Sequence, residues 1–371
     1  MELKIFNKDL ELISIIDTFS SFRFNQKFYD IGECELHLPF SLEFLEALTI
    51  DNIIYINKEN AFIIHTREII RDTDGAEWLV IYGKSLIDIL SRRINYNQVI
   101  EKNKSGNEVV KRLINENIIS PSDKKRIIDN LVIGNLVEVD KINYQNTYGN
   151  ILEELFELSK TLDVSFCLEL DYINKKLILN SFKGIDRSIN QNELSYCIFS
   201  QEFENVEEQE YTNSLENYKN VTLVAGAGEG IERKKLEISD NNFGLERKEL
   251  YVDARDLSDK EQQEDKEGNS IEVDISDEEY LEMLRQRGNE KLAEYKKIET
   301  FESKILLNSN LKYGEDFNIG DTVTVINKKW NLIINTKITE VEEVWEDTKS
   351  ISVTFGDNIP TLIDKIKMKM G

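Results

Sequence analysis

The chain has 371 residues, 40% hydrophobic and 31% charged, which is enough for two or three domains with buried cores. With only 3 prolines and 17 glycines it is neither disordered nor collagen-like. The formal net charge of −24 disfavours specific binding to DNA or to an anionic membrane, because Lys and Arg side chains supply most of that affinity.

Membrane and export signals are also missing from the sequence. No apolar run has spanning length, so we expect no membrane insertion. The N-terminus lacks a basic start before an apolar core, which predicts no signal peptide. We therefore expect synthesis as a soluble protein in the cytoplasm.

The first unit, which we place at residues 1–94, is predicted to consist mainly of strands. Apolar and polar residues alternate through most of 1–39, as in half-buried strands. Ser41 is placed to cap a short helix at 41–48. More strands follow in 51–83, and a helix at 84–93 closes the unit.

Between residues 95 and 204 the apolar period changes. Spacings of three and four predict amphipathic helices at 107–117 and 148–162. Alternation predicts strands at 164–170 and 176–182. We expect a small α+β domain inserted between two β-rich ends of the chain.

The last unit, residues 205–371, returns to strands but also contains a long helix. Ser276 and Glu279 form a capping-box pattern at the start of this helix, predicted at 277–298. Its apolar face is expected to pack on the strands that follow and consists of Leu281, Leu284, Leu292 and Tyr295. The polar stretch 256–274 is predicted to be an exposed, mobile excursion.

Two stretches, 51–83 and 321–357, resemble each other. At a fixed offset, Asp51, Ile56, Asn57, Lys58, Ile63, Ile64 and Thr66 meet Asp321, Ile326, Asn327, Lys328, Ile333, Ile334 and Thr336. After a three-residue insertion, Val80, Tyr82 and Gly83 meet Val353, Phe355 and Gly356, and apolar helical stretches follow at 85–90 and 361–366. Isoleucine-rich strands align by chance, but the ungapped block and the shared turn favour an internal duplication of one β-unit.

Two glycine motifs suggest phosphate binding at first sight. Gly83-Lys84-Ser85 lies between a strand and a helix, but Trp78 replaces the glycine that a P-loop requires. We interpret Gly83 as a strand exit and Ser85 as a helix cap. The glycine-rich stretch 226–230 is followed by an alternating segment, not by a helix, so it predicts a hairpin tip and no dinucleotide site.

Metal-binding and redox patterns are weak. Cys34, Cys167 and Cys197 are widely spaced and odd in number, which predicts buried structural thiols. The only histidines, His37 and His65, lie in predicted strands without Cys or carboxylate partners at ligand spacing. We expect no metal site, no Ser-His-Asp triad and no cofactor.

Six sequence blocks carry a resemblance to a known family. They are YDIGECELHLPF (29–40), VIYGKSLIDILSRRI (80–94), YVDARDLSD (251–259), YLEMLRQRGNEKLAEYK (280–296), YGEDFNIGDTVTV (313–325) and ITEVEEVWED (338–347). Together they resemble the tail hub proteins of bacteriophages and of contractile phage-tail-like bacteriocins, in particular the hub or tail-associated family of siphophages and defective prophages. None of the blocks is a catalytic signature.

This resemblance implies an α+β, β-rich fold with two tail-tube-like antiparallel β-barrel units, 1–94 and 205–371, flanking the inserted domain 95–204. It implies a homotrimer in the virion tail or baseplate, synthesised in the host bacterial cytoplasm. Three chains then present six barrel units, so that a threefold spike or tip meets a sixfold tube. The implied partners are the tail tube or tube-initiator protein, the spike or tail-tip protein and baseplate proteins. The negative charge suits a channel wall past which DNA slides.

Two other functions remain open from the sequence. A carbohydrate- or receptor-binding tail module could stack sugars on exposed tryptophans, for which Trp78, Trp330 and Trp345 are candidates. A muralytic hydrolase would need a carboxylate couple such as Glu207–Glu208 or Glu342–Glu343, although 70 acidic residues produce such pairs freely. We expect a structural protein that is no enzyme, and we assign no catalytic, cofactor-binding or metal-binding residue.

Overall fold

The computed structural model describes residues 1–239, 242–264, 270–306 and 309–356. Within these residues no helix is both long and apolar enough to cross a membrane. The apolar stretch 361–366, predicted as a helix, lies outside the described residues.

The N-terminal segment is a set of short antiparallel strands with one short helix. In chain order it contains β1 (Leu3–Phe6), β2 (Leu12–Ile16), β3 (Ser21–Lys27), β4 (Glu33–Pro39), α1 (Leu42–Ala47), β5 (Ile53–Tyr55), β6 (Ala61–Arg71), β7 (Glu77–Ser85) and the 3-10 helix η1 (Leu86–Arg92). Alternate residues of β4, namely Cys34, Leu36 and Leu38, are buried, as the alternation predicts. Ser41 caps α1, because its Oγ accepts a hydrogen bond from the Phe44 N–H at 3.0 Å.

The middle segment packs two helices against two small sheets. Its elements are β8 (Gln98–Ser105), α2 (Gly106–Ile114), the π-helix η2 (Asn115–Ile119), η3 (Lys124–Arg126), β9 (Leu131–Ile133), β10 (Lys141–Thr147), α3 (Ile151–Leu162), β11 (Ser165–Asp171) and β12 (Lys176–Phe182). β8 pairs with β10, and β9, β12 and β11 form the other sheet. One apolar core runs from α2 and α3 through η1 to Phe6 and Ile53 of the first segment. The middle segment is therefore fixed to the first one.

The C-terminal segment forms a second set of mainly antiparallel strands. Its strands are β13 (Ile198–Ser200), β14 (Val206–Ser214), β20 (Ile298–Ile305), β21 (Thr322–Asn327), β22 (Leu332–Trp345) and β23 (Lys349–Gly356), with η4 (Gln201–Phe203) after β13. Phe199, Phe301, Phe317 and Phe355 are among the buried residues of its own core. β13 joins this sheet by parallel pairing with β21.

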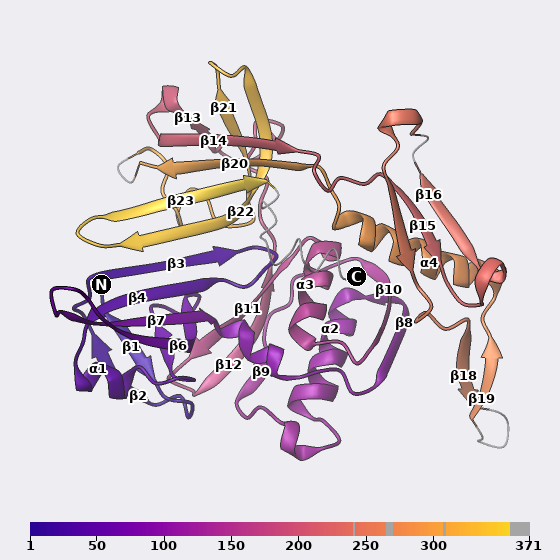
Figure 1. Ribbon diagram of the computed structural model, residues 1–371, viewed down its shortest axis with the longest axis horizontal. Coiled ribbons are helices and arrows are strands. Elements are labelled where there is room, and N and C mark those ends of the chain that lie inside the picture. The colour runs from indigo at the N-terminus through magenta and orange to yellow at the C-terminus, as the bar shows by residue number, and fades with distance from the viewer. Residues whose placement is uncertain (240–241, 265–269, 307–308, 357–371) are drawn as a thin grey trace.

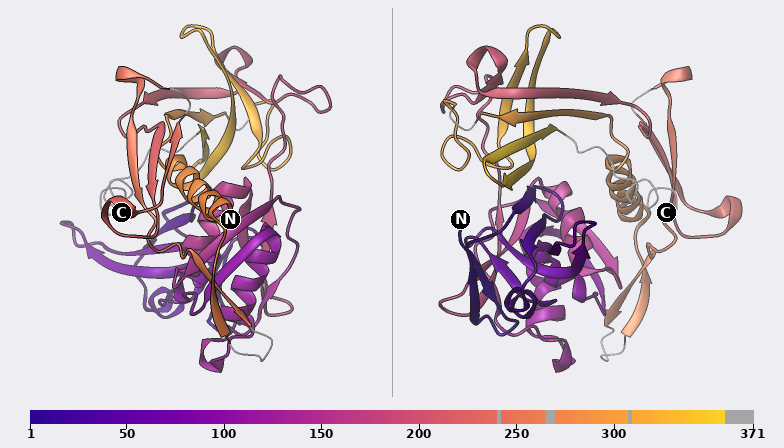
Figure 2. Two further views of the ribbon diagram at one scale, coloured as in Figure 1. Left: turned by 90° about the vertical axis from the view of Figure 1, so that its right-hand side faces the viewer. Right: turned by 60° about the vertical axis from the view of Figure 1, so that its left-hand side comes forward.

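A separate lobe is inserted between β14 and β20 and stands beside the main sheet (Figures 1 and 2). It consists of β15 (Val221–Ala225), η5 (Gly230–Glu232), β16 (Lys235–Ser239), η6 (Gly244–Glu246), β17 (Glu249–Asp253), the hairpin β18 (Lys260–Glu264) and β19 (Ser270–Asp274), and α4 (Asp277–Ala293). The region 256–274, predicted as an exposed, mobile excursion, contains two strands that pair in register.

The helix of this lobe differs from its prediction in length and in packing. α4 ends at Ala293 and not at 298, because Ile298 already begins β20. Its buried positions are Tyr280, Leu284 and Gly288, and they pack on β15, β16 and β17 instead of the strands that follow. Gly288 allows this close approach, since a Cβ there would lie 2.6 Å from a methyl carbon of Val224.

The strand order of the first segment repeats in the third. The order β3-β4-β7-β6-β5 corresponds to β14-β20-β23-β22-β21, and every neighbouring pair in both sets is antiparallel. The duplication inferred from the sequence is therefore visible as a common topology.

A shared turn defines which residues of the two copies are equivalent. The Asn52 N–H donates a hydrogen bond to the Thr49 carbonyl, and the Asp321 N–H donates one to the Asn318 carbonyl. The N···O distance is 3.1 Å in both. The third residue of each turn has positive φ, 70° at Asp51 and 90° at Gly320. The N–H of this third residue donates a hydrogen bond to the carbonyl of Ile64 in the first copy and of Ile338 in the second. A β-bulge follows each of these isoleucines.

This equivalence corrects the register of the sequence alignment. The fixed offset had matched Ile63 with Ile333, but Ile63 is 3% exposed and Ile333 is 66% exposed. The hairpins differ: Tyr55 pairs with Ala61 in one, and Asn327 with Leu332 in the other, so an ungapped match misplaces the second strand.

Candidate assembly surfaces

The two copies are joined edge to edge into one sheet of 13 strands (Figure 1). β22 pairs antiparallel with β3, from Glu340 opposite Lys27 to Trp345 opposite Phe22. Side chains reinforce this junction: Asn25 Nδ2 donates to Glu340 Oε1 at 2.6 Å. The main path of strands is then β14-β20-β23-β22-β3-β4-β7-β6, with β5, β1 and β2 beyond it.

Two strand edges along this path have no neighbour within the described residues. β14 pairs only with β20, and β6 from Thr66 to Arg71 pairs only with β7. The β6 edge carries Ile69 and Ile70, whose side chains are 55% and 45% exposed. Unpaired strand edges are templates for pairing with another chain, so these two are candidate interfaces.

The face of the path that points away from the cores is polar and has more acidic than basic residues. By the register of the strands it includes Glu35, Glu208, Glu210, Glu302, Glu340 and Glu342 with Arg23, Lys27 and Lys304. Arg23 bridges the junction, with Nη2 2.7 Å from Glu35 and Nε 3.6 Å from Glu342. Hydrogen bonding by His37, and then the charge of Arg23, lower the pKa of Glu35, whereas burial raises that of Glu340. We name this surface the open face.

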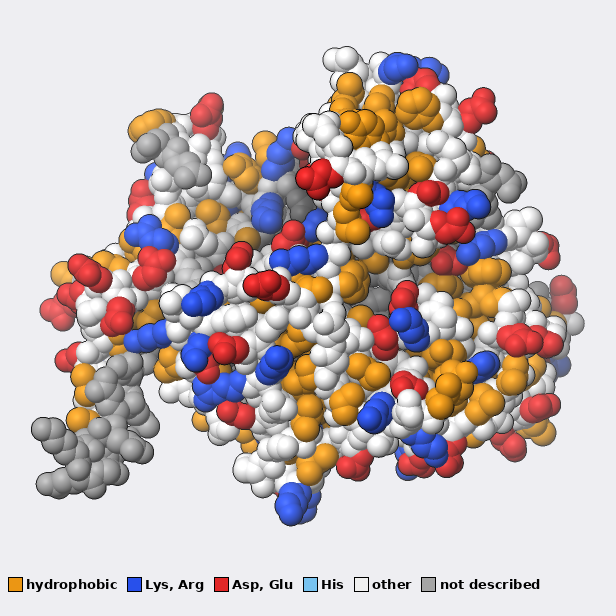
Figure 3. Space-filling view, turned by 180° about the vertical axis from the view of Figure 1, so that it is seen from behind, with side chains coloured by type: hydrophobic (Ala, Val, Ile, Leu, Met, Phe, Trp, Pro, Cys, Tyr) orange, Lys and Arg blue, Asp and Glu red, His pale blue; other side chains and the backbone are white. Residues whose placement is uncertain are grey.

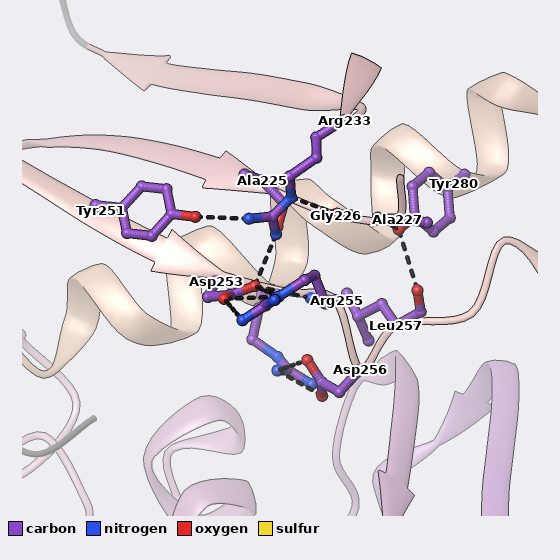
Figure 4. Close-up of polar contacts among 11 residues, drawn as sticks. Ala225, Gly226, Ala227, Arg233, Tyr251, Asp253, Arg255, Asp256, Leu257 and Tyr280 are labelled. Carbon is purple, nitrogen blue, oxygen red and sulfur yellow. Dashed lines mark hydrogen bonds and ion pairs between the residues drawn. The ribbon is translucent and has the colours of Figure 1, made fainter. Parts of the chain in front are cut away.

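The lobe contains a network of polar contacts centred on Arg233 (Figure 4). Arg233 donates to the carbonyls of Ala225 and Gly226, to the Tyr251 hydroxyl at 2.8 Å and to Asp253 at 2.7 Å. Hydrogen bonds from Arg255 and then from Arg233 lower the pKa of Asp253 to about 2. A carboxylate held by two guanidinium groups is a poor proton carrier, so this network is structural.

Tyr280 of α4 closes the same network from the other side. Its hydroxyl accepts from the Ala227 N–H at 2.7 Å and donates to the Leu257 carbonyl at 3.1 Å. A Cβ at Gly226 would lie 2.3 Å from that hydroxyl, which explains the first glycine of the 226–230 motif. The motif is the tip between β15 and β16, as predicted from the sequence.

A groove separates α4 from α3, β8 and β10 and contains half-buried carboxyl groups. Glu154 accepts from the Tyr144 hydroxyl at 2.7 Å and from Asn146 at 2.6 Å. On α4, Gln286 donates to the Asn143 carbonyl and to Glu290. Burial raises the pKa of both Glu154 and Glu290. These contacts dock the lobe on the middle segment.

The histidines and cysteines have local partners or are buried. His37 Nε2 lies 2.6 Å from Glu35, and His65 Nε2 lies 2.7 Å from Asp88. No group of three or more potential metal ligands occurs in the part of the chain that is described. Burial raises the pKa of all three thiols, Cys34, Cys167 and Cys197, so they are weak nucleophiles.

The carboxylate couples considered for hydrolysis are used in the fold. Glu207 pairs with Lys304 at 3.1 Å and Glu343 with Lys349 at 2.7 Å. Glu342 and Glu343 are successive residues of β22, so their side chains point to opposite faces of the sheet. Neither couple converges on a cleft.

Two local interpretations of the sequence need correction. Gly83 lies within β7, opposite Cys34, and does not end the strand. A Cβ there would be 2.8 Å from the Cys34 sulfur, which explains the glycine. Ser85 precedes η1, but its side chain makes no capping hydrogen bond.

The tryptophans do not form a common sugar platform. The indole N–H of Trp78 donates to Asp72 at 3.3 Å and that of Trp345 donates to Glu343 at 3.1 Å. Trp330 is 47% exposed and lies in the turn between β21 and β22.

Comparison with known proteins agrees with the resemblance seen in the sequence blocks. The model of the Siphovirus ReqiPepy6 Gp37-like protein family matches residues 2–357. The chain belongs to this family. Among curated proteins, none matches this chain.

Solved tail proteins share the fold of this chain. A tail protein from Neisseria meningitidis MC58 has a TM-score of 0.57 at 12% identity, covering 96% of both chains. Prophage tail protein gp18 from Listeria monocytogenes EGD-e has a TM-score of 0.54 at 12% identity, covering all of both chains. The 43 kDa tail protein of prophage MuSo2 from Shewanella oneidensis has 0.55 at 12%, covering 96% and 97%. Family and fold together support a structural role in a phage tail.

Proposed function

We propose that this chain is the structural hub of a phage tail or phage-tail-like particle, a homotrimer that connects a sixfold tail tube to a threefold spike or tip. The observation that carries the proposal is the β22–β3 junction, which joins two copies of one strand order in a single chain. Three such chains supply six equivalent units, which resolves the mismatch between threefold and sixfold symmetry.

In this proposal, 1–94 and 205–371 are the tube-like β-barrel units, and 95–204 is the domain inserted between them. The open face lines the channel. Its excess of glutamate would keep DNA from adhering as it passes, because phosphate binding depends on basic side chains. On the face shown in Figure 3, acidic and basic side chains are interspersed and form no basic stripe.

The test is reconstitution with the neighbouring tail proteins. The chain would be co-expressed with the tube and spike proteins of its own tail, and the particles examined by electron microscopy. We expect three copies in a ring at the end of the tube, between tube and spike. A copy number other than three, or a position on the outside of the tail, would contradict the hub.

The same preparation tests the two alternative functions. A receptor-binding module would bind purified host cell-wall polysaccharide and would be found at the distal surface of the particle. A muralytic hydrolase would clear a zymogram, and clearing would be lost in Glu154→Gln or Glu290→Gln, two carboxyls of the groove whose pKa is raised by burial. We expect neither binding nor clearing.

A further inference from the structure

We propose that the chains join head to tail by pairing the free edge of β6 with the free edge of β14 of a second copy, in the register of the β22–β3 junction. This inference rests on the proposed hub and names the residues of its subunit interface. The junction inside the chain is the template, because β22 and β3 are the repeats of β6 and β14.

The equivalence of β6 with β22 follows from the shared turn and bulge. Ile64 corresponds to Ile338, so Thr66 corresponds to Glu340 and Glu68 to Glu342. In β22 the edge that starts at Glu340 is the one occupied by β3. The corresponding edge of β6 starts at Thr66 and pairs with nothing in the described residues.

The equivalence of β3 with β14 follows from the strand pairs that lead across the sheet, from the bulge in β6 to β3 and from the bulge in β22 to β14. In the first copy, Ile64 pairs with Gly83. Gly83 pairs in turn with Cys34, and Cys34 pairs with Phe24. In the second copy, Ile338 pairs with Phe355. Phe355 pairs in turn with Phe301, and Phe301 pairs with Tyr211. Phe24 thus corresponds to Tyr211, an aromatic residue in both copies.

Transferring the register of the junction gives specific contacts. Glu343 lies opposite Phe24, so Ile69 should lie opposite the partner's Tyr211. Glu342 lies opposite Asn25, so Glu68 should lie opposite the partner's Thr212. Trp345 lies opposite Phe22, so Arg71 should lie opposite the partner's Gln209.

The side chains favour this register over its neighbours. It places the exposed Ile69 against an aromatic ring, a favourable cross-strand pair. A slip of two residues in one direction would place Glu68 opposite the partner's Glu210, two like charges, and a slip in the other would place Ile69 opposite Asn213. A slip of one residue would exchange the faces of the strand.

The position of the two edges suits ring closure. They lie at opposite ends of the path β14-β20-β23-β22-β3-β4-β7-β6, so each chain offers one edge to the next chain and the other to the previous one (Figure 1). Such a heterologous contact gives a closed ring when the rotation between subunits fits. In a ring of three chains both of these edges are paired.

Cysteine pairs test the register directly. Glu68→Cys combined with Thr212→Cys places two thiols opposite each other between chains. The matched control, Glu342→Cys with Asn25→Cys, places thiols at the equivalent positions within one chain and must form an intrachain disulfide. The slip control, Glu68→Cys with Glu210→Cys, reports the register shifted by two residues. The native cysteines are buried or nearly so and remain in all variants.

Each variant would be concentrated, oxidised and analysed by non-reducing electrophoresis and mass spectrometry. We expect covalent dimers and trimers from Glu68→Cys/Thr212→Cys, several-fold more than from the slip control. If the intrachain control closes while the two interchain pairs give equal yields, the edge pairing is wrong. A reconstituted trimer without this cross-link would also overturn the pairing and leave the hub intact. Cross-linked rings of another copy number would support the pairing and overturn the trimeric hub.

Discussion

At the scale of single residues, Arg233 holds the lobe together. One guanidinium group satisfies two backbone carbonyls at the end of β15 and also binds Tyr251 and Asp253 of β17. It therefore links the hairpin tip to the neighbouring strand. No sequence pattern singles out this arginine, because its partners lie in two separate segments of the chain, 225–226 and 251–253.

Arg233→Ala should destabilise the lobe by about 1–3 kcal/mol, since the buried Gly226 carbonyl loses its donor, and the Ala225 carbonyl and the Asp253 carboxylate each lose one of their donors. Hydrogen exchange of the β15–β17 amides should become correspondingly faster, while exchange in β3 and β4 stays unchanged. Arg255→Ala is the matched control, because Arg255 is exposed and binds only Asp253 among the residues described. Equal exchange in both variants would contradict this role for Arg233.

Glu290 gives a pH dependence to the contact of the lobe with the middle segment. Burial raises its pKa above the value in the unfolded chain, so folding favours the protonated carboxyl. The stability that it contributes is fully present below the unfolded pKa, about 4.3. That contribution is lost as the pH rises through the higher, folded pKa.

Glu290→Gln should therefore stabilise the docking of α4 at pH 8 and have much less effect near pH 4. Limited proteolysis of the lobe at both pH values measures this difference. Glu282→Gln on the same helix is the control, because Glu282 is exposed and pairs only with Arg285 among the described residues. An equal effect of Glu290→Gln at the two pH values would show that its protonation does not matter.

At the scale of elements, α4 illustrates the difference between a local signal and a packing partner. The predicted N-cap is confirmed: Ser276 Oγ accepts from the Glu279 N–H at 3.3 Å, and the same hydroxyl donates to the Glu279 carboxylate at 3.1 Å. The packing partner was predicted incorrectly, because the buried stripe of Tyr280, Leu284 and Gly288 faces β15–β17. Capping depends on four consecutive residues, whereas packing depends on strands that lie elsewhere in the chain.

Ser276→Ala should cost about 0.5–2 kcal/mol of helix stability, because the first turn loses a side-chain acceptor. Faster hydrogen exchange in the first turn of α4 would report this loss. Ser276→Asp retains an acceptor at the N-cap and should restore protection. Failure of the Asp variant to do so would mean that the hydroxyl acts in some way other than capping.

At the scale of the whole molecule, the exposed isoleucines of β6 lie in the proposed interface between chains. Ile69→Lys should leave the monomer folded, since the side chain is 55% exposed, but should weaken self-association by at least about tenfold, or 1.4 kcal/mol. Sedimentation of the reconstituted assembly measures the change. Ile173→Lys is the control, because Ile173 is 79% exposed in the turn between β11 and β12, two strands of a different sheet. Equal weakening by the two substitutions would exclude a specific role for the β6 edge.

The sequence by itself determined the faces and ends of many elements and the presence of a repeat. Alternation in β4 and the N-caps of α1 and α4 are set by neighbours in the chain, and they agree with the structure. The resemblance of six short blocks was enough to indicate a phage tail protein, in agreement with the family match over residues 2–357.

Only the tertiary structure decided which edges meet and how the repeats align. A period of two tells which face of a strand is buried but not which strand lies beside it. The pairing of β22 with β3 joins residues separated by more than three hundred positions, such as Phe22 and Trp345, and no local pattern marks it. The free edges of β6 and β14 became candidate interfaces only once that junction was visible, because an edge is defined by the neighbour it lacks.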